Sequence, residues 1–146
     1  MSTSSPPAGP VGTPYAGERL GLPPEGRGAV AGWPRRVLAL FVDWLTCLLV
    51  AGAIGGSAVM ESHGAESWLP LLVFLVEATV LTALVGGSFG QLLLRVAVVR
   101  MDRRPLSLLT ALLRTFLICL VVPPVVYNRD QRGLHDLATG TVAVRR

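Results

Sequence analysis

The sequence predicts an all-α integral membrane protein with two transmembrane helices, followed by a third apolar helical segment that either spans the membrane or re-enters it. Three apolar segments carry this prediction, at about residues 37–59, 68–85 and 106–127. The first has 23 residues, and at about 1.5 Å per residue it is long enough to cross a hydrocarbon layer of roughly 30 Å. The hydrophobic content of 51% and the mean hydropathy of +0.57 point the same way.

The distribution of charge indicates the class of partner, and the positions of the cysteines indicate their chemical state. The net charge of +4 comes with thirteen basic residues, all of them arginine. These arginines flank the apolar segments and do not form one basic patch with interleaved aromatic residues, which favours anionic lipid head groups over nucleic acid as their counter-charge. Cys47 and Cys119 lie inside apolar runs and are expected to be reduced, buried thiols, not a disulfide or metal ligands.

The chain divides into a tail and a membrane domain. Residues 1–28 contain six prolines with many Gly and Ser and have almost no periodic apolar pattern. Such a segment cannot bury enough apolar surface to offset the entropy lost on ordering, so the sequence predicts a disordered cytoplasmic tail. The membrane domain is expected at residues 33–146, and it opens with Trp33 and Pro34, an interfacial aromatic and a proline suited to a first helical turn.

The first apolar segment follows an arginine pair and contains one acidic residue, Asp43. Arg35 and Arg36 place its N-terminal end in the cytoplasm by the positive-inside tendency. A carboxylate at membrane depth is costly, so Asp43 is expected to face protein or a polar cavity instead of lipid. Arg36, seven residues earlier, is nearly two helical turns away on the same face and is the nearest candidate partner. Gly52 and Gly56 form a GxxxG spacing, which predicts close packing against a helix of this chain or of a second copy.

The second apolar segment carries an acid at its centre, Glu77. This residue is either a neutral acid that hydrogen-bonds within the helix bundle or a carrier of protons or cations. The loop before the segment has no arginine and is expected on the outer side, and its potential ligands are too scattered to predict a metal site: Glu61, His63 and Glu66.

Inner-side elements are expected after the second segment. Gly87, Ser88 and Gly90 form a turn there, and arginines follow it. β-branched residues recur at two places and predict two short strands that pair at the cytoplasmic face: Val96, Val98 and Val99 in one, and Thr139, Thr141, Val142 and Val144 in the other.

The third apolar segment carries Arg114 near its middle and Pro123 and Pro124 near its end. A full span would put the arginines of residues 128–146 outside, against the pattern of the other loops, and would separate the two strands. A re-entrant segment, broken by the proline pair, returns the chain to the inner face and is the preferred interpretation.

This pattern resembles the RDD family of small bacterial membrane proteins, named for an arginine and two aspartates. The resemblance implies that those residues are Arg36, Asp43 and Asp136. The chain departs from it at Gln91, where members often carry a basic residue, and at residues 102–104, where members have an Asp-Gly turn. Transport, including cation/proton exchange, has been proposed for members. Besides the three named residues, the features that carry the resemblance are Gly87, Ser88, Gly90, Arg114, Leu134, His135, Gly140 and Thr141.

Two functions fit these residues. In the first, the protein is a transporter in which Asp43 and Glu77 carry ions while Arg36 and Arg114 set their pKa values; it requires an oligomer, because so few helices cannot enclose a pathway. In the second, it is a non-transporting assembly or scaffold subunit, with Arg36 paired to Asp43 and Arg114 paired to Glu77.

An enzyme is not expected, and no cofactor is implied. His135 stands beside Asp136, but no Ser or Cys nucleophile has a visible base. A structural Asp136, which accepts backbone or arginine hydrogen bonds at the inner face, is the preferred interpretation.

Overall fold

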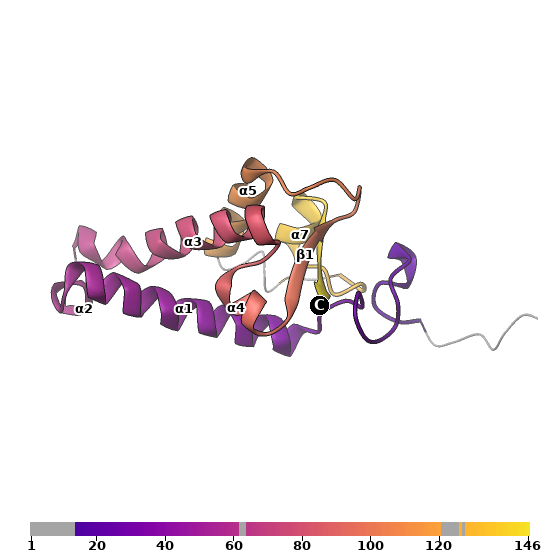
Figure 1. Cartoon of the computed structure of the whole chain (residues 1–146), viewed down its shortest axis with the longest axis horizontal. Helices are drawn as coiled ribbons and strands as arrows, with labels where there is room; N and C mark the ends of the chain where they lie inside the picture. The colour runs from indigo at the N-terminus through magenta and orange to yellow at the C-terminus, as the bar shows by residue number, and fades with distance from the viewer. Residues whose placement is uncertain (1–13, 62–63, 121–125, 127) are drawn as a thin grey trace, which may run out of the picture.

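The computed structural model of the chain describes residues 14–61, 64–120, 126 and 128–146. Two long helices lie side by side, α1 (Trp33–Gly55) and α3 (Leu69–Val85), joined through the short helices α2 (Ala58–Glu61) and η2 (Ala65–Trp68) (Figure 1). A small sheet and several short helices gather at the end where α1 begins (Figure 1). These are α4 (Phe89–Leu93), β1 (Val96–Arg100), α5 (Leu108–Cys119), α7 (Leu134–Ala138) and β2 (Thr141–Arg145).

The two expected spans are confirmed as helices of sufficient length and apolarity to cross a membrane, Trp33–Gly55 and Ala65–Val85. Only 22% and 28% of the apolar 18-residue stretches within these helices are buried, whereas a core helix of a water-soluble protein would be mostly buried. Helix α1 ends at Gly55, short of the expected Val59, because Gly56 has φ +67°, a left-handed conformation that interrupts the helix.

Gly52 and Gly56, the predicted GxxxG pair, do not pack against another helix in the described part of the chain. Gly56 lies outside α1 as its C-cap, and a Cβ atom placed on Gly52 would meet nothing within 4 Å. Of the glycines within α1, Gly55 lies close to neighbours, because a Cβ atom there would meet Val59 and Leu69. Packing of Gly52 against a second copy stays a prediction.

The described part of the third apolar segment contains a helix, α5, that is too short to span a membrane. Helix α5 has 12 residues, about 18 Å of rise against a hydrocarbon layer of roughly 30 Å. The strands before and after it pair with each other, so the chain returns to the side it came from. The structure thus favours the re-entrant path over a third span, while the proline pair at 123 and 124 lies outside the described residues.

The predicted strand pair is confirmed and is antiparallel, in a register that runs from Val96 opposite Arg145 to Arg100 opposite Thr141. Thr139, expected in the second strand, instead caps the end of α7. The turn after β1 contains Arg103 at φ +57°, so an arginine takes a left-handed conformation that glycine would adopt more easily.

Part of the segment expected to be disordered lies on this sheet. Val30 bridges Val144, and the Gly28 amide donates to the Arg145 carbonyl at 2.8 Å. Leu20, the last residue of the short helix η1 (Glu18–Leu20), and Leu22 pack against the apolar cluster that contains Val30 and Val144. Residues 14–28 therefore have a defined path, because a few leucines within a Pro/Gly-rich segment suffice to cover an apolar sheet face. Residues 1–13 lie outside the described part.

Helix α4 lies tightly against α1. Gln91 accepts a hydrogen bond from the Ser88 amide at 3.2 Å, so its side chain caps the start of the helix. Gly90 is buried, and a Cβ atom there would overlap the carbonyl of Ala39 in α1 and approach the Asp43 carboxyl to 3.0 Å. Only glycine allows this approach.

We expect Gly90→Ala to destabilise the protein by about 3 kcal/mol, because the added methyl group must displace helix backbone. The measurement is thermal unfolding of the purified protein in detergent. Gly64→Ala is the matched control: it adds the same methyl group in open space at an exposed position with φ −103°, where alanine should change the stability by no more than about 0.5 kcal/mol. Equal stability of the two variants would contradict the packing described for α4.

Candidate functional site

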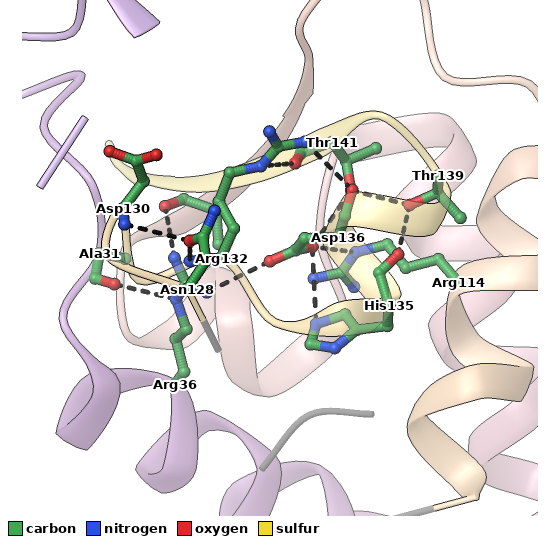
Figure 2. A network of polar contacts seen from close by, with 11 residues as sticks. Ala31, Arg36, Arg114, Asn128, Asp130, Arg132, His135, Asp136, Thr139 and Thr141 are labelled. Atoms are coloured by element: carbon green, nitrogen blue, oxygen red, sulfur yellow. Dashed lines mark hydrogen bonds and ion pairs between the residues drawn. The ribbon is translucent and has the colours of Figure 1, made fainter. Parts of the chain in front are cut away.

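A buried carboxylate, Asp136, stands at the centre of a polar network at the sheet end of the molecule (Figure 2). Its side chain is 0% exposed. One oxygen, Oδ1, accepts hydrogen bonds from Arg114 Nε at 3.0 Å and from Thr141 Oγ1 at 3.1 Å. The other, Oδ2, accepts from Arg36 Nη1 at 3.2 Å. The carboxylate thus joins α1, α5, α7 and β2.

Two arginines of this network also hold backbone carbonyls. Arg36 donates from Nε to Ala31 at 2.9 Å and from Nη2 to Ala143 at 3.2 Å. Arg132 donates from Nε to Thr141 at 3.0 Å and from Nη2 to the Asp136 carbonyl at 3.3 Å. Each guanidinium therefore ties the sheet to a neighbouring segment (Figure 2).

The charges around Asp136 keep it ionised. Burial raises the pKa of its carboxyl, but Arg114, His135 and Arg36 together outweigh burial and hold the pKa below its usual value. His135 Nε2 lies 3.5 Å from Oδ1. The prediction that Asp136 is a structural residue bound by arginine agrees with this geometry.

Asp43 is buried in protein, as predicted, but its partner is not Arg36. Its side chain is 2% exposed. Oδ2 accepts a hydrogen bond from Ser88 Oγ at 2.6 Å, and Oδ1 accepts one from the Gly90 amide at 2.5 Å. The expected pair of Arg36 and Asp43 is wrong, because Arg36 turns toward the sheet to reach Asp136.

Glu77 is likewise held by the turn before α4. Its Oε1 accepts a hydrogen bond from the Phe89 amide at 2.7 Å, and its Oε2 is buried with no hydrogen-bond partner among the described residues. The expected pair of Arg114 and Glu77 is therefore also wrong. Both acids of the apolar helices bind amides at the start of α4, where free N–H groups favour an anion.

A cavity of about 80 Å³ lies between the Asp136 network and the Asp43 contact. Two of the hydroxyls in its wall, those of Thr82 and Thr115, are buried and have no hydrogen-bond partner among the described residues. The volume suits a few waters, each of which occupies about 30 Å³ in the liquid. The polar residues that line the cavity are Arg36, Asp43, Thr82, Ser88, Gln91, Arg114, Thr115, Gln131 and His135.

The cavity brings together some of the predicted site residues and not others. Arg36, Asp43 and Arg114 line it, and Asp136 is one hydrogen bond away from it. Glu77 is absent from its wall. Sequence reasoning missed Thr82 and Thr115, although hydroxyls within apolar runs are a usable signal for a buried polar surface.

Comparison with protein families gives one match. The model described as the RDD family matches residues 30–140, which include Arg36, Asp43, Arg114, Asp136 and all of the elements that form the cavity. No curated protein matches the chain, and no solved structure matches it.

We expect Asp136→Asn to destabilise the protein by about 3–5 kcal/mol, because Arg36 and Arg114 would keep their buried charge without a counter-charge. Chemical or thermal unfolding in detergent at neutral pH measures this. Asp102→Asn is the control: it breaks the exposed ion pair with Arg100, and we expect little change.

The loss should depend on pH. Since the pKa of Asp136 is lowered on folding, its charge stabilises the fold above the unfolded-state pKa of about 4, and this contribution disappears as the pH falls through the lower pKa of the folded state. The gap between wild type and Asp136→Asn should therefore narrow in acid, and a gap independent of pH would contradict the assignment.

Asp43→Leu and Asp43→Asn should separate the shape of Asp43 from its charge. Leucine leaves the Gly90 amide and the Ser88 hydroxyl without an acceptor, and we expect a loss of about 2–4 kcal/mol. Asparagine can accept from Gly90 and donate to the rotatable hydroxyl of Ser88, so its stability should lie within about 1 kcal/mol of wild type. Unfolding in detergent decides this, and a stable Asp43→Leu variant would refute the structural importance of the two hydrogen bonds.

Proposed function

The chain belongs to the RDD family, and from that membership we propose that it is a multi-pass plasma-membrane protein that binds and releases protons or small cations at Asp43. Its N-terminal side faces the cytoplasm in this proposal, because the start of α1 and the sheet lie at the same end (Figure 1) and both carry arginines. The membrane location in this proposal rests on membership of the RDD family. The ion site rests on the residues that line the cavity.

The observation that carries the proposal is the wall of the cavity. Asp43, Thr82 and Thr115 line it together, and each is no more than 2% exposed. The two hydroxyls have no protein partner among the described residues, so an occupant of the cavity would satisfy them. Carboxylate and hydroxyl oxygens suit water, hydronium and hard cations.

The position of Asp43 along α1 fits exchange at membrane depth. It is ten residues beyond Trp33, which corresponds to about 15 Å along the helix axis. An acid at this depth is costly unless it is neutralised or serves a pathway. A proton or cation taken up from the cavity would supply that neutralisation.

The charges that face the cavity favour a readily reversible site. Arg36 and Arg114 carry two positive charges, and Asp136 compensates one of them. One positive charge therefore remains uncompensated at the wall of the cavity that Asp43 also lines. It opposes the binding of a further cation and so favours release of the ion.

Transport requires more than one copy of the chain. Two long helices and the short α5 cannot enclose a continuous pathway. Gly52 lies on a face of α1 with Leu45 and Leu49, which are 58% and 75% exposed. We propose that this face packs against a second copy, because a small residue beside exposed leucines allows close approach of helices.

A non-transporting assembly or scaffold subunit is the second candidate. It is favoured by the contacts of the two acids, since Asp43 and Glu77 both hold the start of α4. In that role the acids would fix the fold and carry no ion. Under either candidate we propose no enzymatic role for His135 and Asp136, because the network fixes Asp136 with three donors.

The test is ion flux in vesicles that contain the purified protein. We expect wild type to exchange protons against Na⁺ or K⁺, read by an internal pH-sensitive dye, and Asp43→Asn to fall to the level of protein-free vesicles. Asparagine keeps the hydrogen bonds of Asp43 but cannot exchange a proton. Glu66→Gln, which removes an exposed acid, is the matched control and should keep full flux.

Glu77→Gln gives a further comparison. Gln can still accept from the Phe89 amide, so we expect most of the flux to remain. Full flux in Asp43→Asn would overturn the proposal. Absence of flux in wild type, together with a foreign membrane protein that co-purifies in fixed ratio, would favour the scaffold role.

A further inference from the structure

A second pocket lies outside the polar network, between the start of α1 and the end of α4. It has a volume of about 390 Å³ and is lined by Arg35, Leu38, Leu93, Leu94 and Arg95. Figure 1 shows α4 beside the N-terminal part of α1. The pocket therefore lies near the level of Trp33, which is 47% exposed and marks the expected boundary between lipid and water.

The two arginines of this pocket have no carboxylate partner in the described part of the chain. The ion pairs there involve other arginines, namely Arg36, Arg100 and Arg114. Arg35 donates from Nη1 to the Leu94 carbonyl at 3.4 Å, which draws its guanidinium to the α4 side of the pocket. Arg95 is exposed, and its side chain makes no hydrogen bond or ion pair with the described part of the chain. Two uncompensated positive charges thus face one pocket.

The backbone holds Arg95 in a defined place. It has φ +54°, a left-handed conformation that bulky residues rarely adopt. The conformation is fixed on both sides, because the Arg95 amide donates to Leu92 at 3.1 Å and its carbonyl accepts from the Arg146 amide at 2.8 Å. The arginine is consequently presented from a rigid junction between α4 and β1.

The rest of the wall is apolar and open. Leu38 and Leu93 are 58% and 62% exposed. Leu38 follows Arg35 by three residues, so it lies on the same helical face and about 4.5 Å deeper along α1. The pocket therefore combines a cationic rim with an apolar surface directed along the expected span.

We propose that this pocket binds one anionic phospholipid, with its phosphodiester between Arg35 and Arg95 and an acyl chain over Leu38 and Leu93. Guanidinium groups bind phosphate oxygens in a bidentate manner. A soluble phosphate ester would use the arginines but would leave the leucines uncovered. The combination of charge and exposed leucine favours the lipid.

The test uses the full chain in neutral detergent, titrated with dioleoyl phosphatidylglycerol and, in parallel, dioleoyl phosphatidylcholine, with retained lipid counted by native mass spectrometry. We expect Arg35→Gln and Arg95→Asn each to weaken phosphatidylglycerol binding about five-fold, which corresponds to about 1 kcal/mol per arginine near an anionic surface. Asparagine is chosen because it tolerates the left-handed backbone. Phosphatidylcholine should bind weakly to every variant.

Arg103→Asn is the matched control, because Arg103 is also exposed and left-handed, with φ +57°, but lies outside this pocket. It should bind phosphatidylglycerol like wild type. An equal loss in Arg103→Asn and Arg95→Asn would overturn the proposal in favour of diffuse attraction. Because Arg35→Gln also removes a hydrogen bond, its unfolding temperature is measured, and Arg95→Asn alone carries the test if Arg35→Gln is unstable.

A second arm separates the lipid from a soluble anion. Glycerophosphoglycerol, the phosphatidylglycerol head group without acyl chains, should bind much more weakly than the lipid. Leu38→Ser with Leu93→Ser should weaken lipid binding and leave head-group binding unchanged. Equal affinity for the head group and the whole lipid would overturn the lipid assignment.

Discussion

Two arginines from different helices, Arg36 of α1 and Arg114 of α5, converge on the fully buried carboxylate of Asp136. Removing three charges from water costs several kcal/mol per ion, and their attraction offsets that cost only where the remaining donors and acceptors are also bonded. Here the Thr141 hydroxyl donates a further hydrogen bond to the carboxylate, and two backbone carbonyls accept hydrogen bonds from Arg36. The short helices and the sheet are placed where they satisfy this network.

The two acids of the long helices are also held by hydrogen bonds, but their donors are different. Asp43 and Glu77 lie on separate long helices, and both accept amide hydrogen bonds from the start of α4. A five-residue helix thereby clamps the two long ones together. The cavity lies between the Asp43 contact at the start of α4 and the Asp136 network. Charged side chains that are fixed by hydrogen bonds therefore bound it on both sides.

Periodicity and length predicted the elements well, because they depend on local pattern. The two long helices, the strand pair and the burial of Asp43 were expected, and the family match agrees with the resemblance drawn from Arg36, Asp43 and Asp136. The partners of the charges were not predicted. Helical spacing placed Arg36 beside Asp43, but spacing compares neighbours in sequence, whereas Asp136 is 100 residues away.

Other features could not be predicted from residue types or from average composition. The amides of Phe89 and Gly90 are backbone donors, which no residue type reveals. Leu20 and Leu22 were hidden by the average composition of a Pro/Gly-rich segment, although they pack on the sheet. The oligomer, the ion and the lipid stay proposals, since each depends on a molecule other than this chain.

The 100 residues between Arg36 and Asp136 have a consequence for biosynthesis. At roughly 5–20 residues per second, the ribosome needs about 5–20 s to make the partner of an arginine that has already entered the membrane boundary. During that interval only lipid head groups or water can bind the Arg36 side chain in place of Asp136. The sheet cannot form either, because β2 has not yet been made. The network that holds the short helices and the sheet therefore closes only when the last segment of the chain, which carries Asp136 and β2, has been made.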